Sequence, residues 1–235
     1  MLLNQVGENI WIYDGGEVKI LAFPFSTRMT VVRLSDNSLW VHSPCNLDDA
    51  LKAELSGLGE VSYLVSPNKL HHLFMLEWIK TYPTAKTYSS PGLAEKRKDI
   101  RFNKELSEEA EEEWTTDIDQ TIFRGSPVME EVVFYHKLSK TLILADLIEN
   151  FNPDALNWWQ RSVAKIAGIL SPNGKMPIDW RMSYIFGDKQ KARSSLNIML
   201  NWDTKNIILS HGKCVLENGN EFLKKSYKWL IKVHN

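Results

Sequence analysis

The sequence predicts an α/β fold in which one domain spans residues 1–235. Two observations lead to this prediction. Apolar segments with strand spacing alternate along the chain with segments of helical spacing, which is typical of layered α/β proteins. The chain also divides into two strand-rich halves, each followed by helices. A length of 235 residues suits one large domain or two small ones, and no repeat or low-complexity segment separates the halves.

The first half is predicted to begin with two hairpins. Residues 9–23 alternate around Gly15 and Gly16, where we expect a turn. Residues 28–44 repeat the pattern around Asp36 and Asn37. The elements expected next are a helix over 47–59, a strand over 60–67, a helix over 70–83, a strand over 85–90 and a helix entry at 91–100.

The second half follows an acidic segment, 104–113, which we interpret as a solvated loop. Its expected elements are strands over 120–127, 131–139 and 140–148, a helix over 153–168, a helix over 189–202, a strand over 205–212 and a last amphipathic helix over 220–233. The segment between the first two of these helices, which contains Arg181, is expected to be a loop. Arg181 is interpreted as an ion-pair partner or as a contact for an anionic substrate.

Composition narrows the classes of partner. A net charge of −1 argues against a nucleic-acid or anionic-membrane partner, either of which usually requires a basic patch. No apolar run reaches the length of a membrane span, and no secretory segment opens the chain. Two cysteines are too few for a disulfide framework, so a cytoplasmic setting is expected. A small-molecule substrate remains as the expected partner, and the sequence leaves the oligomeric state open.

Three apolar strand segments end in side chains that can bind a metal ion. The segment over 60–66 leads to His71 and His72, the segment over 140–145 leads to Asp146, and the segment over 205–210 leads to His211. Ligands gather at strand ends in α/β proteins because the loops there can converge. Imidazole and carboxylate groups suit zinc and similar divalent ions.

This order of motifs resembles the metallo-β-lactamase-like superfamily. There, one strand ends in Thr-His-x-His-x-Asp-His, a later strand ends in Asp, and a last strand ends in His, often before Gly. This chain has SPNKLHH, LILADL and IILSHG at these places. The segments PFSTRMTVVRLSDNSLWVHSP, HHLF and PGLAEKR are similar to a domain-of-unknown-function branch of that superfamily. The resemblance implies a four-layer αββα sandwich with two mixed sheets.

The chain also departs from the superfamily pattern. Alignment of SPNKLHH with the motif places Pro67 and Lys69 at the first two histidines, and no histidine occurs near FRGSP, where a third is usual. The first metal position of the superfamily is therefore lost. Its second position becomes His71, His72, Asp146 and His211. The resemblance thus implies one divalent ion, with zinc as the first choice and iron or manganese as alternatives.

Three functions remain open at this point, and the third is redox chemistry on a bound iron, which some members of the superfamily bind. In the first, the protein is a metal-dependent hydrolase of unknown substrate, in which Asp146 binds the ion and His71 is a ligand or the general base. Lys69 is then a candidate for holding a substrate oxyanion, although a solvent-facing lysine is the simpler interpretation. In the second, the fold is a non-catalytic binding or scaffold protein without a metal. His42 is expected to orient a ligand or to serve as a structural histidine.

Overall fold

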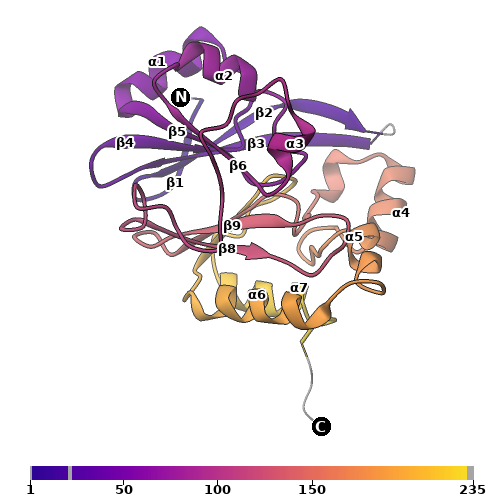
Figure 1. The fold of residues 1–235 in the computed structure, drawn as a ribbon. Helices are drawn as coiled ribbons and strands as arrows, with labels where there is room; N and C mark the ends of the chain where they lie inside the picture. Colours follow the sequence, from indigo (N-terminus) through magenta and orange to yellow (C-terminus); the bar gives the residue numbers. More distant parts are fainter. Residues whose placement is uncertain (1, 21–22, 232–235) are drawn as a thin grey trace.

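The computed structural model describes residues 2–20 and 23–231, which form four layers in the order helix, sheet, sheet, helix (Figure 1). One sheet contains seven strands in the order β1 to β7, and the other contains four in the order β11-β10-β9-β8. Both sheets are mixed, because each combines parallel and antiparallel neighbours. The αββα sandwich predicted from the sequence is therefore confirmed.

The seven-stranded sheet comes from the first half of the chain. Its strands are β1 (Asn4–Gly7), β2 (Ile10–Ile20), β3 (Phe23–Arg33), β4 (Ser38–His42), β5 (Glu60–Ser66), β6 (Lys86–Ser89) and β7 (Lys104–Glu105). The helices of this half are α1 (Asp49–Leu58), α2 (Met75–Thr81) and α3 (Leu93–Lys96). Asp48 caps α1, because its side chain accepts a hydrogen bond from the backbone nitrogen of Leu51.

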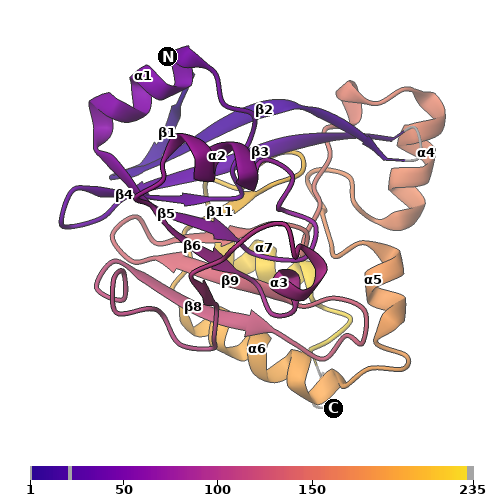
Figure 2. The ribbon, with the colours of Figure 1, turned by 45° about the horizontal axis from the view of Figure 1, so that its top comes forward.

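The four-stranded sheet comes from the second half. Its strands are β8 (Ile118–Phe123), β9 (Glu131–His136), β10 (Thr141–Leu144) and β11 (Asn206–Leu209). The helices are the 3₁₀ turn η1 (Pro153–Ala155), α4 (Trp158–Ala167), α5 (Ile178–Ser183), α6 (Lys189–Asn201) and α7 (Gly219–Ser226). The views in Figures 1 and 2 place α6 and α7 on the outer face of this sheet and α4 beside the outer part of β2 and β3.

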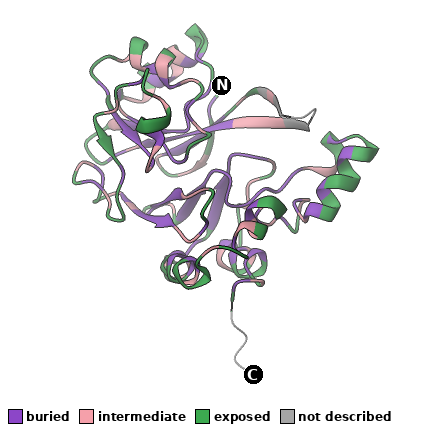
Figure 3. Cartoon of the chain, turned by 45° about the vertical axis from the view of Figure 1, so that its right-hand side comes forward, coloured by how far each residue is buried: buried purple, intermediate pink, exposed green. Residues whose placement is uncertain are grey.

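Strand alternation explains how two sheets share one core. Val31 packs toward α1 and α2, whereas Val32 packs between the sheets. In β10, Ile143 points between the sheets, and Leu142 and Leu144 pack toward α6 and α7. Successive strand side chains face opposite sides, so continuous apolar strands can bury both faces. In Figure 3 the central strands are accordingly mostly buried, the outer part of β2 and β3 is intermediate, and the helices expose their outer sides.

The structure corrects four sequence-based expectations. Gly15 and Gly16 do not form a turn, because β2 runs through them with a register shift between Asp14 and Glu17. The expected helix over 70–83 begins only at Met75, and turns precede it. The loop expected around Arg181 contains α5. The last helix ends at Ser226, and positions 232 and 233 of the predicted helix lie outside the described residues.

Candidate functional site

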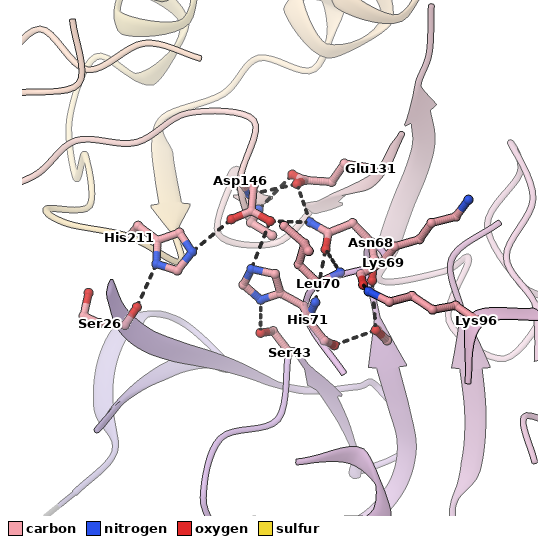
Figure 4. Close-up of polar contacts among 12 residues, drawn as sticks. Ser26, Ser43, Asn68, Lys69, Leu70, His71, Lys96, Glu131, Asp146 and His211 are labelled. Carbon is pink, nitrogen blue, oxygen red and sulfur yellow. Dashed lines mark hydrogen bonds and ion pairs between the residues drawn. The ribbon is translucent and has the colours of Figure 1, made fainter. Parts of the chain in front are cut away.

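The register of two parallel strands places Asp146 beside His211. In the β10–β11 pair, Leu144 lies opposite Leu209. Asp146 and His211, two positions further along each chain segment, therefore lie side by side at the same edge of the sheet. His71 arrives at this edge from the loop that follows β5. The two oxygens of Asp146 face one imidazole each: Oδ2 lies 3.2 Å from Nε2 of His71, and Oδ1 lies 2.9 Å from Nε2 of His211 (Figure 4).

Each of the two imidazoles is held through its other nitrogen. Nδ1 of His211 lies 2.8 Å from the carbonyl oxygen of Ser26, and a carbonyl only accepts, so this nitrogen carries a hydrogen. Nδ1 of His71 lies 2.5 Å from the Ser43 hydroxyl. When His211 is neutral, its Nε2 therefore presents a lone pair to the Asp146 carboxylate. Such an arrangement is stable when a cation, either a proton or a metal ion, lies between the two groups.

The donor set fits a divalent metal ion. One ligand atom from each of His71, Asp146 and His211 can be chosen so that all three lie within 4.8 Å of one another. Imidazole and carboxylate are the ligands that zinc, iron and manganese accept. Hydrogen bonds at the non-ligating imidazole nitrogen are typical of metal-binding histidines, because they fix the tautomer and the ring orientation.

Two further polar residues, Asn68 and Glu131, hold the carboxylate in place. The Asn68 amide nitrogen donates to Asp146 Oδ2 at 2.8 Å and to Glu131 at 3.0 Å, and its oxygen accepts from the backbone of Leu70 and His71. Glu131 accepts from the backbone nitrogens of Ala145 and Asp146. Asn68 and Glu131 are fully buried. They therefore join the end of β5, the start of β9 and the end of β10 at the site.

Burial and charge set the protonation of these carboxyl groups. Burial by itself raises the pKa of Asp146, but the charges and hydrogen bonds of His71 and His211 outweigh it and hold this pKa well below its usual range. Burial and the neighbouring Asp146 carboxylate raise the pKa of Glu131 to about 8. Burial lowers the pKa of His211, but Asp146, Glu149 and the Ser26 carbonyl together outweigh burial and raise this pKa. Asp146 is thus the ionised acid of the group.

The other predicted site residues lie apart from this group. Nδ1 of His72 lies 2.5 Å from the guanidinium of Arg97, which only donates, so the imidazole accepts there. Burial and the Arg97 charge lower the pKa of His72. Lys69 is exposed and its ammonium lies beside Gly92. In Figure 4 the Lys69 side chain extends away from Asp146. Only three of the four proposed metal ligands therefore meet.

The contacts of His42 and Arg181 are those of structural residues. The His42 ring stacks on Trp40 at 5.7 Å between ring centroids and is fully buried. Burial and nearby His71 lower its pKa to about 3, so the ring is neutral. Arg181 donates to the carbonyl of Ala167 at 2.6 Å and so joins α5 to the end of α4.

A cavity of about 500 Å³ opens at the three metal-capable residues. Ser43, His71, Asp146 and His211 line its polar part. Side chains from β2, β3, the loop after β5, α4 and α5 form the rest, which is mostly apolar. Glu149 also lines the cavity, and burial raises its pKa to about 8. Asn68, Glu131 and Glu149 were not predicted from the sequence, although an acidic residue at the start of an apolar strand segment is a usable signal for Glu131.

Solved structures show which known folds the chain is similar to. The metallo-β-lactamase DIM-1 exposed to ceftazidime matches with a TM-score of 0.64 at 16% identity, over 97% of both chains. A metallo-β-lactamase from Hirschia baltica matches with a TM-score of 0.64 at 13% identity, over 98% of both chains. The metallo-β-lactamase FIM-1 from Pseudomonas aeruginosa in its mono-zinc form matches with a TM-score of 0.63 at 9% identity, over 97% of this chain and 93% of that one.

These identities establish the fold and nothing finer. No curated protein matches the chain. Across the described residues, no helix combines the length and apolar character that a bilayer span requires. The model of one family, described as a domain of unknown function (DUF4336), matches residues 7–164, which is most of the chain. The chain therefore belongs to the DUF4336 family and has the metallo-β-lactamase fold.

Proposed function

We propose that the protein is a metal-dependent hydrolase with one divalent ion, zinc as the first choice, bound by His71, Asp146 and His211. The observation that carries this proposal is the convergence of two imidazole nitrogens on one buried carboxylate. The hydrogen bond from His211 to the Ser26 carbonyl adds to it, because it turns the other ring nitrogen toward the ion position. The similar structure of FIM-1 is described as a mono-zinc form, so one ion is compatible with this fold.

Three protein ligands support catalysis better than four. A tetrahedral ion with four protein ligands is typical of a structural site, whereas three leave a position for water or substrate. The contact of His72 with Arg97 supports the three-ligand arrangement. When bound, such an ion polarises a carbonyl group and lowers the pKa of a bound water to about 7.

The side chains around the ion position have separable roles in this proposal. Ser26 and Ser43 orient the two imidazoles through their Nδ1 atoms. Asn68 holds the Asp146 carboxylate by a hydrogen bond to Oδ2. Glu149 lines the cavity, and burial raises its pKa to about 8 in the metal-free protein, so we assign it as the proton donor to the leaving group.

Metal analysis of protein purified without chelator tests the proposal. We expect about one ion per chain in the wild type and in His72→Gln, and a loss of the ion in His71→Gln. The two variants are a matched pair, because the histidines are adjacent and only the first faces Asp146. If neither metal nor turnover of esters, lactones, thioesters or phosphodiesters is found after supplementation, the non-catalytic alternative replaces the proposal.

A second candidate is hydrolysis by Ser43 without a metal. The Ser43 hydroxyl lies 2.5 Å from His71 Nδ1, and Nε2 of that ring faces Asp146, which gives a Ser-His-Asp chain. Ser43 also lines the cavity and has a positive φ of 53°, a conformation that is strained for serine. Turnover that survives a chelator and disappears in Ser43→Ala would favour this candidate over the metal-dependent one.

A further inference from the structure

The mouth of the site cavity is built from large apolar side chains that remain exposed to solvent. Five of the residues that line the cavity are exposed in this way: Leu70 (50%), Leu73 (58%), Trp159 (36%), Val163 (50%) and Ile178 (42%). They come from the loop after β5, from α4 and from α5. Apolar surface arranged around one opening becomes buried only when an apolar ligand enters, and this burial favours binding.

The interior of the cavity continues this apolar surface. Ala167, Ile169 and Trp180 are buried and line it together with Phe25 and Phe74. The polar group of His71, Asp146 and His211 lies in the same cavity. A volume of about 500 Å³ lies within the range of roughly 300–1,000 Å³ that is typical of small-molecule sites. The cavity can therefore hold a small molecule with one reactive polar end and an apolar body.

Charge in the cavity restricts that molecule further. Asp146 and Asp179 line the cavity, and none of the lining residues within the described part of the chain is a lysine or arginine. A ligand with a negative charge on its apolar body would lose hydration there without gaining a cationic partner. An uncharged hydrocarbon body loses no such hydration.

We propose that the substrate is an ester or thioester whose acyl group is a long or bulky uncharged hydrocarbon, seated against Trp159 and Val163 of α4. This inference rests on the proposed function for the chemistry at the polar end. Hydrolysis consumes one water: the bond from the acyl carbon to the leaving oxygen or sulfur breaks, hydroxide adds to the acyl carbon, and the remaining proton goes to the leaving group. The products are a carboxylic acid and an alcohol or thiol.

A chain-length series tests the proposal in the metal-loaded protein. Along 4-nitrophenyl esters from acetate to octanoate, kcat/KM is expected to rise by about twofold to fourfold for each methylene that becomes buried. Trp159→Ser should lower the octanoate-to-acetate ratio of kcat/KM by about tenfold, because it removes apolar surface from the mouth. Trp158→Ser is the matched control, since its side chain is 81% exposed and does not line the cavity.

A binding measurement separates this proposal from the hydrolase proposal. The uncharged dye Nile red is titrated into Asp146→Asn protein in the presence of a chelator, so that metal and turnover play no part. Saturable binding that methyl dodecanoate displaces more strongly than dodecanoate does, and that weakens in Trp159→Ser but not in Trp158→Ser, supports the apolar site even if no substrate is turned over.

Three results would overturn the inference. The first is a kcat/KM that does not depend on acyl chain length. The second is dye binding that is not saturable or that is equally weakened by the two tryptophan variants. The third is a dimer that Trp159→Ser converts to a monomer in light scattering, because the apolar mouth would then be an interface between two copies of the chain.

Discussion

Removal of the Asn68 side chain should weaken both the fold and the metal site. Asn68 makes four hydrogen bonds: it donates to Asp146 and Glu131 and accepts from the backbone of Leu70 and His71. At about 1 kcal/mol for a neutral hydrogen bond and about 2 kcal/mol for one to a charged group, the upper limit for Asn68→Ala is about 5–6 kcal/mol. In the variant, the backbone nitrogens of Leu70 and His71 can bond to water instead, because Leu70 is exposed. We therefore expect the free energy of unfolding to fall by about 3–4 kcal/mol.

The effect on metal binding follows from the same contacts. Asp146 loses the donor that orients Oδ2, and the loop that carries His71 loses its anchor. Changes in groups that orient metal ligands typically cost about 10-fold to 100-fold in metal affinity, and we expect a loss in that range. Urea denaturation measures the free energy of unfolding of the metal-free protein, and competition with a chelator of known affinity measures the metal Kd.

Asn206→Ala is the control for loss of a buried asparagine. Asn206 begins β11, at the opposite end of the strand from His211, and its amide bonds to Ser139 and Thr141. It should lower stability by about 1 kcal/mol and leave the metal Kd unchanged. If Asn68→Ala also leaves the metal Kd unchanged while stability falls, Asn68 is only a structural residue and our account of the site is wrong.

Three further predictions concern pH, backbone conformation and proton transfer. Burial lowers the pKa of His136 to about 4, so the unfolded state binds a proton first, and this residue alone should lower the free energy of unfolding by about 2 kcal/mol between about pH 7 and pH 5. In urea denaturation, His136→Gln should reduce the fall in stability by about this amount, and an unchanged fall would contradict burial as its cause. Gly212 has φ of +88°, and a Cβ there would lie 2.2 Å from the carbonyl oxygen of Asn150. Gly212→Ala should therefore lower the free energy of unfolding by at least about 2 kcal/mol and weaken metal binding through the neighbouring His211. Unchanged stability in calorimetry together with unchanged affinity in metal titration would refute this prediction. Glu149→Gln should lower kcat by about 10²-fold or more with little change in metal content, and an effect confined to poor leaving groups would identify Glu149 as their proton donor.

Much of the fold was predictable because its signals are local. Apolar runs bounded by turn residues identified most of the strands, and helical spacing of apolar residues identified α1. The turn expected at Gly15 and Gly16 was wrong because neighbouring β3 pairs with β2 on both sides of the glycines and absorbs them as a bulge. The short helix α5 was missed because its six residues, which follow Pro177, are too few to show a clear helical period.

Chain order and residue type determined the α/β class and the candidates His71, Asp146 and His211, because apolar strands that end in metal-capable side chains can be recognised without coordinates. The αββα sandwich was implied by the resemblance of these motifs to the metallo-β-lactamase-like superfamily. Only the tertiary structure decided which side chains meet. His71 and His72 are adjacent in the sequence, yet a turn points one ring at Asp146 and the other at Arg97. Asn68, Glu131 and Glu149 join the site through contacts across separate strands, and side-chain direction within a loop depends on partners that the local sequence does not contain.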